Sequence, residues 1–417
     1  MKFILVSVGT RGDMEPFLTL AGLLNKNGHQ TLCAFPEQFR KLAEDAGIPF
    51  YGLSPKFLEL IEGDDAVNLM GGKISALKKL KILIKLYKLG VVVNKELVEQ
   101  QELLFNNEKP DRVIFNGKST YPIIWEFLNP GKSFLLSPVP CLIHSLKEYP
   151  HIGFKGDYGP FFNQLTYKLS NFGLLKNIQD TTKSIRKKHD IKGSDVKKAL
   201  FGTKMIYTIS PSIFKQPDYW PEHVKVVGYH ERNKAGNWKP DNKLLQFIKD
   251  HDKLLFFTFG SMTNPEPLEK TKIILEILER NRIPAIINTA SGGLIQPENY
   301  DSDLVYFVET IPYDWVFSKV FAVIHHGGSG TTHAAIKNGC STMILPHIID
   351  QFLWNNLMFN AGVGPKGIAV DKLTTENLEP KILDIFKNEE YSKKACDLGE
   401  SMKQEDLSKE LYDILIS

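Results

Sequence analysis

The sequence predicts an α/β protein with two doubly wound parallel sheets. Short apolar runs alternate with amphipathic helical patterns along both halves of the 417 residues, and a stretch poor in apolar residues separates the halves. Hydrophobic residues make up 42% of the chain, and a chain of this length exceeds what one core usually holds. We therefore predict a first domain over residues 1–230 and a second over residues 231–417. A linker is expected at about residues 228–241, and the C-terminal helices could pack back on the first domain.

The first half opens with a β-α-β-α-β pattern, which is typical of a Rossmann-like sheet. Residues 2–8 form an apolar run that predicts a buried strand, and a polar loop over residues 9–13 leads to a helix over residues 16–27. The next helix is expected over residues 37–46. The remaining strands are predicted over residues 30–35, 49–53, 112–115, 133–137, 205–209 and 224–227.

The alternation starts again in the second half. Helices are predicted over residues 268–280 and 353–361, and the tail over residues 375–417 is helical throughout. Strands are predicted over residues 254–259, 285–289, 304–308, 321–324 and 342–345. The second half is therefore expected to be another α/β domain.

Composition excludes several classes of protein. The formal net charge is only +3, so no overall field favours nucleic acid. The four cysteines lack CxxC spacing, which fits a reducing cytoplasm better than a disulfide or zinc framework. The apolar run at the start is too short for a signal peptide, and no run approaches the roughly 18 apolar residues of a membrane-spanning helix. We expect a cytoplasmic protein with at most peripheral membrane contact.

A glycine-rich loop follows the strand predicted over residues 321–324 and precedes a helix; residues 325–332 read HHGGSGTT. Glycines let the backbone approach a diphosphate, and a helix N-terminus offers unpaired N–H groups to an anion. Side-chain hydroxyls of Ser329 and Thr331 can donate as well. The loop matches neither GxGxxG nor GxxxxGK[ST], which weakens dinucleotide and NTPase interpretations. The alternative is a tight turn with a threonine cap.

Residues beyond this loop extend the pattern. The loop, followed by Pro346, Asp350, Gln351, Trp354, Asn355 and residues 362–364, resembles the sugar-donor signature of the UDP-glycosyltransferase superfamily. The likeness is closest to sterol glucosyltransferases and bacterial antibiotic or macrolide-type glycosyltransferases. Supporting matches are residues 9–13 (GTRGD), residues 259–262 (FGSM), Ile311, Pro312, Asp314 and Trp315. The resemblance implies the GT-B fold, in which two facing Rossmann-like domains hold the active site in an interdomain cleft.

The resemblance also implies which residues bind a UDP-sugar, most simply UDP-glucose, although the residues leave dTDP open. The resemblance implies that the diphosphate is bound by Ser261, His326, Gly328, Ser329, Gly330 and Thr331. Asp350 and Gln351 would bind the sugar hydroxyls, since carboxylate and amide groups can pair with adjacent hydroxyls. Trp315 belongs to a loop that would border the base. The alternatives are core packing for Trp315 and a strand-end cap for Ser261.

Glycosyl transfer needs a group that takes the acceptor's proton. Asp13 ends the loop after the first strand, and the matching aspartate of the resembled branches is the presumed base, with Thr10 and Gly12 beside it at the acceptor. The alternative for Asp13 is the N-cap of a helix that begins near Glu15. No DxD pair accompanies the phosphate loop, so we expect no metal and no cofactor. Direct displacement on an α-linked donor would invert it and give a β-glycoside.

A helix predicted over residues 73–104 carries an apolar stripe that includes Ile84 and Tyr87. The stripe beside it consists of Lys78, Lys81, Lys85 and Lys88. Such a helix suits an anionic membrane surface, and the alternative is a helix packed on its own domain with a solvated lysine face. Residues 138–167 are rich in Phe, Tyr, Leu and Pro, which favours a lipophilic acceptor such as a sterol, terpenoid or polyketide.

Two other functions fit parts of this pattern. A GT-B epimerase or phosphorylase would share the phosphate loop but would not need Asp350, Gln351 and the GTRGD segment together. A non-catalytic partner protein would keep the fold but lose donor binding, and the presence of Asp13, His326 and Thr331 argues against it.

Overall fold

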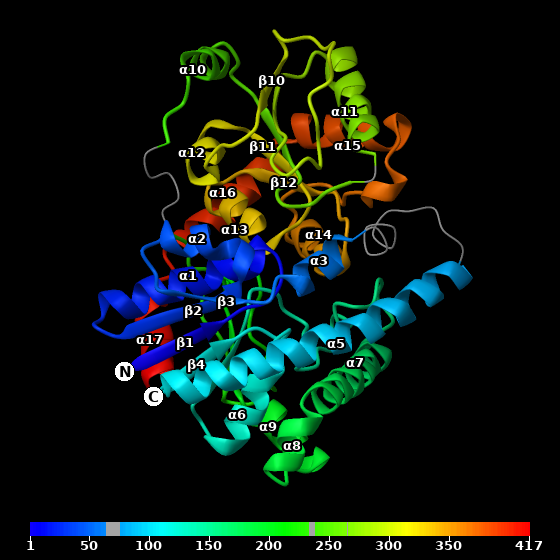
Figure 1. Cartoon of the computed structure of the whole chain (residues 1–417). Helices are drawn as coiled ribbons and strands as arrows, with labels where there is room; N and C mark the ends of the chain where they lie inside the picture. The colour runs from blue at the N-terminus through cyan, green and yellow to red at the C-terminus, as the bar shows by residue number, and fades with distance from the viewer. Residues whose placement is uncertain (64–75, 233–237, 265) are drawn as a thin grey trace. The chain divides into compact units, whose positions relative to one another are not determined.

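The computed structural model describes residues 1–63, 76–232, 238–264 and 266–417, and it divides into two compact units (Figure 1). The first unit contains the described residues up to Arg232 together with Asp406–Ser417. The second contains the described residues from 238 to 405. Residues 233–237 of the predicted linker and residues 73–75 of the predicted lysine helix lie outside the described residues.

The first unit is built on a seven-stranded parallel sheet in the order β3-β2-β1-β4-β5-β6-β7. The strands are β1 (Lys2–Val6), β2 (Gln30–Pro36), β3 (Phe50–Leu53), β4 (Arg112–Phe115), β5 (Ser133–Ser137), β6 (Lys204–Tyr207) and β7 (Val224–Val226). β1 pairs in parallel with both β2 and β4. The strands β2 and β3 are therefore added on one side of β1 and the later strands on the other, which makes a switch point between β1 and β4. In parallel sheets, ligands bind beyond the carboxyl ends of strands at such a switch point.

The second unit repeats this arrangement with five strands in the order β10-β9-β8-β11-β12. The strands are β8 (Leu255–Thr258), β9 (Ala285–Asn288), β10 (Val305–Val308), β11 (Ala322–His325) and β12 (Ser341–Ile344). Here the switch point lies between β8 and β11, where Thr258 and His325 are register partners at the strand ends. Both faces of β8 are buried, with Phe257 in one core cluster and Phe256 in another, as expected for a parallel sheet covered on both sides.

Helices connect the strands in both units. Those of the first unit are α1 (Arg11–Lys26), η1 (Glu37–Phe39), α2 (Arg40–Glu44), α3 (Lys56–Glu62), α5 (Ala76–Glu108), α6 (Tyr121–Leu128), α7 (Pro160–Thr181), α8 (Lys183–Lys188), α9 (Gly193–Gly202) and α17 (Ser408–Ile416). Those of the second are α10 (Asn242–Lys249), α11 (Pro267–Asn281), α12 (Tyr313–Val316), η2 (Phe317–Lys319), α13 (Ser329–Lys337), α14 (Ile349–Ala361), η3 (Val370–Lys372), α15 (Thr375–Lys387) and α16 (Glu389–Lys403). No helix in the described part of the chain is long and apolar enough to cross a membrane.

Every predicted strand is present, but two helices begin about one turn earlier than predicted. α1 begins at Arg11 because Thr10, with extended backbone, takes the N-cap position. Pro16 then lies inside the helix, where it leaves the carbonyl of Gly12 without an intrahelical donor. Gly12 is exposed, so water can hydrate that carbonyl. α14 begins at Ile349, so the residues predicted to contact the sugar stand in its first turn.

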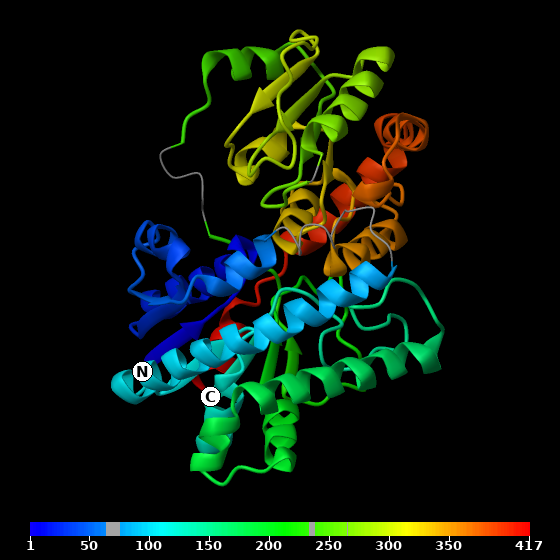
Figure 2. The ribbon, with the colours of Figure 1, turned by 45° about the vertical axis from the view of Figure 1, so that its right-hand side comes forward.

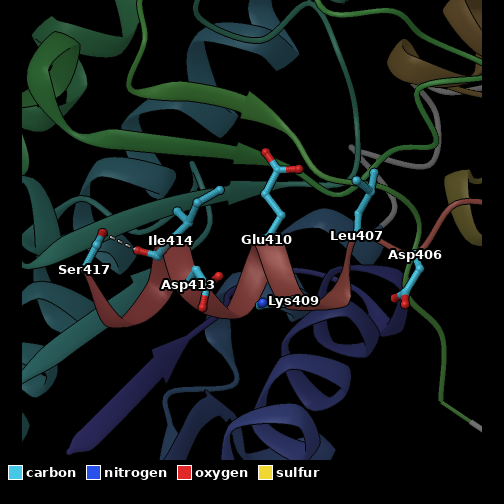
Figure 3. A pocket seen from close by; sticks show the side chains of 7 residues that line it. All are labelled: Asp406, Leu407, Lys409, Glu410, Asp413, Ile414 and Ser417. Atoms are coloured by element: carbon cyan, nitrogen blue, oxygen red, sulfur yellow. Dashed lines mark hydrogen bonds between the residues drawn. The ribbon is translucent and has the colours of Figure 1, made fainter.

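The tail predicted to be helical consists of α15, α16 and α17, and α17 belongs to the first unit. Leu411 and Leu415 of α17 are fully buried in the core that contains Phe3 and Phe17. The Tyr412 hydroxyl lies 2.9 Å from His29 Nε2. Figure 3 shows an open depression along this helix, lined by Asp406, Leu407, Lys409, Glu410, Asp413, Ile414 and Ser417. None of these lining residues belongs to the predicted site.

Candidate active site

Asp13 stands in the first turn of α1, at the switch point of the first sheet. Its Oδ2 accepts hydrogen bonds from the Thr10 N–H at 2.8 Å and from the Thr10 hydroxyl at 3.2 Å. Asp13 is therefore not the N-cap that the sequence offered as an alternative, because Thr10 caps the helix and Asp13 is the third residue of a capping box. Its side chain keeps 21% of its surface exposed, so a ligand can reach it.

A lysine that the sequence analysis did not single out pairs with this carboxylate. Lys118 follows β4, and its Nζ donates to Asp13 Oδ1 at 2.6 Å and to Oδ2 at 2.7 Å. The two residues are far apart in sequence but meet because β4 is the neighbour of β1. Lys118 could have been found from the sequence only by assuming the strand order, because a Rossmann-like order places the fourth strand beside the first.

The loop after β1 is shaped for this pair. Gly9 has φ of +132°, and a Cβ at this position would overlap Asp13 Oδ2 and Lys118 Nζ. The Asn116 amide donates to Ser7 Oγ at 3.0 Å and to the Val8 carbonyl at 2.7 Å, which ties the loop after β4 to the loop after β1. The Ser7 hydroxyl in turn donates to the Asp13 carbonyl at 2.8 Å. The carboxylate is thus held by a network rather than by one contact.

In the second unit, His326 lies between two glycine-bearing loops. A Cβ on Gly260, after β8, would come within 2.8 Å of the His326 Cε1, and one on Gly328 would overlap the Nε2. Gly260 also has φ of +56°. The ring is therefore enclosed by backbone from both strands of the second switch point, and Ser261 is the exposed residue directly after Gly260.

His326 and two neighbouring histidines are neutral. Burial, followed by the charges of His325 and His347, holds the pKa of His326 well below its ordinary value. Burial also lowers the pKa of His325 to about 3 and that of His347 to about 4. The backbone of Thr258, at the end of β8, partly offsets the lowering of the pKa of His326 through a hydrogen bond to the His326 ring. At neutral pH the ring therefore offers a ligand a hydrogen bond and no positive charge.

The glycine loop ends at the N-terminus of α13. Gly328 is the N-cap, and Ser329, Gly330 and Thr331 form the first turn. The Ser329 and Thr331 residues keep 9% and 8% of their surface exposed, whereas Gly330 is exposed. The structure thus brings His326 and these predicted residues onto one loop and one helix end, which is the local geometry of an anion site. His333 has a structural role, because its Nδ1 bonds the Ser329 carbonyl at 2.7 Å.

Gln351 and Asp350 stand in the first turn of α14, beside the same loop. A Cβ on Gly327 would lie 3.2 Å from Gln351 Cβ, so this helix packs closely on the glycine loop. The Gln351 Oε1 accepts from the N–H groups of His347 at 2.7 Å and Ile348 at 3.1 Å, and the residue is only 3% exposed. Its carbonyl oxygen therefore caps α14, and its amide nitrogen is the atom that suits a ligand. Asp350 is partly exposed.

Trp315 is the predicted donor residue with the clearest packing role. Its ring contacts that of Trp238 at a centroid distance of 5.0 Å, and Lys319 Nζ lies 4.4 Å from its centre. Tyr313, two residues earlier, places its hydroxyl 2.8 Å from Thr258 Oγ1 at the end of β8. The loop that carries Trp315 is thus anchored at the strand ends by Tyr313.

Across the ranges that the structure describes, no three His, Cys, Asp or Glu side chains lie close enough together to hold a metal ion.

Two Rossmann-like units, one with a carboxylate at its switch point and one with a glycine loop at a helix N-terminus, define a two-domain, doubly wound α/β protein. Residues 3–105 match the model of the glycosyltransferase family 28 N-terminal domain. Residues 299–417 match that of the erythromycin biosynthesis protein CIII-like C-terminal domain. The two matches lie in different halves of the chain, and each half therefore resembles the UDP-glycosyltransferase superfamily.

Curated relatives include sterol 3-beta-glucosyltransferases. One from Arabidopsis thaliana is 30% identical over 97% of this chain, and one from Komagataella phaffii is 27% identical over the same share. The chain spans 64% of the length of the first relative and 33% of the second.

Solved structures confirm the GT-B type of fold. The glycotransferase of kitacinnamycin superposes with a TM-score of 0.74 over 100% of this chain and 98% of its own, at 13% identity. CalG4, the calicheamicin glycosyltransferase, gives a TM-score of 0.71 over 99% and 98%, at 15% identity. The two Rossmann-like units expected from the sequence are therefore confirmed.

Proposed function

We propose that this chain is a glycosyltransferase that moves a hexose, glucose, from a UDP-sugar to a hydroxyl of a lipophilic acceptor such as a sterol, terpenoid or polyketide. The observation that carries the proposal is the neutral His326 between two glycine loops at the N-terminus of α13. Relatives named as sterol 3-beta-glucosyltransferases support glucose and a lipophilic acceptor. A structural neighbour, the spinosyn rhamnosyltransferase, is complexed with thymidine diphosphate, which keeps dTDP as the competing nucleotide.

We place the donor on the second unit. The first turn of α13 would receive the diphosphate on its N–H groups, helped by the hydroxyls of Ser329 and Thr331 and by Ser261. His326, which is neutral and 6% exposed, would give the diphosphate a hydrogen bond from the same loop. The Gln351 amide and the Asp350 carboxylate would take sugar hydroxyls. The base would rest on the loop that carries Trp315.

Asp13 is the proposed base in the first unit. It would take the proton of the acceptor hydroxyl while the hydroxyl oxygen bonds to the anomeric carbon. The bond from that carbon to the diphosphate oxygen breaks, and both electrons leave with UDP. Attack opposite the leaving group inverts an α-linked donor and gives a β-glycoside. Asp13 Oδ2 already accepts from Thr10 and Lys118, whereas Oδ1 accepts from Lys118, so Oδ1 is the oxygen we assign to the proton.

Lys118 is the proposed positioning residue for that base. Two contacts under 2.8 Å fix both oxygens of the carboxylate, and the loop after β1 leaves no room for another side chain at Gly9. A base held within a few tenths of an ångström of its working position avoids the loss of rate that misplacement causes. Thr10 and Gly12 complete the turn, Thr10 by binding Oδ2 and Gly12 by leaving the approach open.

We further propose that neither a metal nor a cofactor takes part, because the α13 N-terminus supplies the positive potential that a departing diphosphate needs. A cytoplasmic location is proposed from the spacing of the cysteines. Since lipophilic acceptors dissolve in bilayers, peripheral contact with an anionic membrane through Lys78, Lys81, Lys85 and Lys88 also belongs to the proposal.

The test is a screen of UDP- and dTDP-sugars against hydroxylated acceptors held in detergent micelles. Calorimetry measures nucleotide binding, and mass spectrometry with anomeric NMR identifies the product. We expect tighter binding of UDP than of dTDP and a β-glucoside of a sterol or comparable alcohol. Failure of every nucleoside diphosphate to bind would reject the proposal, and an α-linked product would reject its stereochemistry.

A further inference from the structure

Helix α7 presents a continuous apolar face to solvent. The exposed residues on it recur with helical spacing, and they are Phe161, Phe162, Leu165, Leu169 and Phe172. Phe161 and Phe172 keep 73% and 71% of their surface exposed. The opposite face of the helix is buried through Asn163, Thr166 and Tyr167. Phenylalanine side chains are usually buried, and an exposed row of this size marks a surface that another body covers.

Helix α5 lies beside α7 in both views (Figures 1 and 2). The Tyr87 hydroxyl of α5 donates to Asp180 of α7 at 3.5 Å. On α5, Lys78, Lys81, Lys85 and Lys88 are exposed together with Ile84, Leu89 and Val92. Ile84 and Tyr87 of the predicted apolar stripe are about half exposed, so they are not packed inside the domain. The buried side of α5 instead carries residues such as Ile82 and Leu97.

The charge of the first twenty residues of each helix is one-sided, and the acidic residues begin only at Glu96 of α5 and Asp180 of α7. Residues 76–95 contain six lysines and residues 160–179 contain two, and neither segment contains an aspartate or glutamate. The whole chain carries 48 acidic residues and a net charge of only +3, so forty residues without a single acid stand out. A cationic surface with protruding aromatic and aliphatic side chains is what an anionic bilayer binds.

We infer that the apolar face of α7 and the lysine face of α5 form a docking surface for an anionic lipid bilayer. The phenylalanines of α7 would enter the boundary between headgroups and acyl chains, and the lysines would meet the lipid phosphates. This inference rests on the proposed function, because it supplies the place where a lipophilic acceptor is taken up. A second copy of this chain is a poorer occupant, because self-pairing would set lysines against lysines.

The experiment is flotation of the full chain with vesicles of phosphatidylcholine alone or with one third phosphatidylserine. We expect binding to the anionic vesicles that weakens with salt, and much less binding to the neutral ones. Phe161→Ser with Phe172→Ser should lower the bound fraction on anionic vesicles by about tenfold or more. Lys81→Gln with Lys88→Gln should lower the vesicle-binding constant by roughly 25-fold, since each lysine contributes roughly fivefold. Phe359→Ser and Lys409→Gln, exposed sites on other helices, serve as matched controls and should change nothing.

Three results would overturn the inference. They are no binding of the unaltered chain to either vesicle, full binding by the double phenylalanine variant, and a dimer in sedimentation that the phenylalanine changes dissolve. Sugar transfer to an acceptor in detergent micelles is measured as well, because it tests the proposed function without requiring a bilayer. Variants that lose vesicle binding should keep UDP binding and transfer in micelles. Vesicle binding by a chain that transfers no sugar would leave the surface standing and reject the function.

Discussion

At the scale of single residues, Asp13 combines a capping role with an ion pair. It completes the capping box of α1 through Thr10, and it presents a carboxylate that Lys118 fixes at both oxygens. A capping aspartate is common, but one that also pairs with a lysine from the neighbouring strand end and excludes a side chain at Gly9 is more constrained than capping requires. Substitutions can separate the two roles.

Asp13→Asn should abolish transfer while leaving donor binding intact. Asparagine is nearly isosteric and keeps an oxygen for the Thr10 N–H, so α1 remains capped. It cannot take the acceptor's proton, and kcat should fall by at least roughly a hundredfold. Calorimetry with UDP and rates at saturating acceptor check this together. If turnover stays near normal, Asp13 is only a capping residue and the base lies elsewhere.

Lys118→Met should lower kcat by roughly tenfold to a hundredfold, because the carboxylate loses its main positioning contact. The KM for the donor should stay unchanged, since the residues that we propose to bind the donor belong to the other unit. Lys118→Arg should recover much of the rate, which a purely structural effect on folding would not produce. Lys132→Met, an exposed lysine ahead of β5, is the matched control. Equal kcat values for Lys118→Met and the control would refute the positioning role.

At the scale of elements, the carboxyl ends of β8, β11 and β12 gather neutral histidines. Burial lowers the pKa of His333, as of His347, to about 4, and that of His325 to about 3. In the unfolded chain these side chains titrate near 6.5. Between those values the unfolded state binds more protons than the folded one, so stability is present above about pH 6.5 and is lost as the pH falls.

Acidification from pH 7 to pH 5 should therefore lower the free energy of unfolding. Each of the three histidines contributes about 2 kcal/mol to this change, because one pKa unit corresponds to about 1.4 kcal/mol. Urea unfolding at the two pH values measures the effect. Replacement of His333 by Gln should remove one histidine's share of the pH dependence, whatever it does to stability at pH 7. Stability that is flat or higher at pH 5 would contradict the assignment of neutral, buried rings.

The N-terminus of α13 leads to a prediction about metals. If the helix end and its hydroxyls stabilise the departing diphosphate, EDTA should leave the rate of transfer essentially unchanged. The measurement compares initial rates in EDTA with those in magnesium or manganese. A rate that is lost in EDTA and returns with either ion would overturn the prediction.

At the scale of the whole molecule, the two sheets could be predicted from the sequence, whereas some helix ends and some side-chain contacts could not. Buried parallel strands are short apolar runs, so all predicted strands are present. Helix starts depend on local capping, which is why α1 and α14 begin about a turn early. The glycine loop of the donor site is contiguous in sequence and could be found there, whereas the contact between Asp13 and Lys118 depends on strand order. The exposed face of α7 depends on which side of that helix packs, and no local pattern separates that from burial.

The packing of α17 in the core of the first unit gives a whole-molecule prediction. Leu411→Ala should lower the free energy of unfolding by about 2–5 kcal/mol, because the side chain is fully buried among residues from the start of the chain. UDP binding at temperatures below the transition should not change. Asp413→Ala on the exposed side of the same helix is the control and should stay within about 0.5 kcal/mol. Equal stability of both variants would show that α17 is dispensable to the first core.

Because α17 completes the core around Phe3 and Phe17, the first unit uses residues from both ends of the chain. During synthesis, that core cannot be completed until α17 has been made. The described residues of the second unit, 238–264 and 266–405, are made before α17. Nascent domains commonly fold in order from the N-terminus. In this protein the order is reversed. The first unit, although most of it is made first, can complete its core only after the second unit has been made, and until then the surface that α17 covers stays exposed to water.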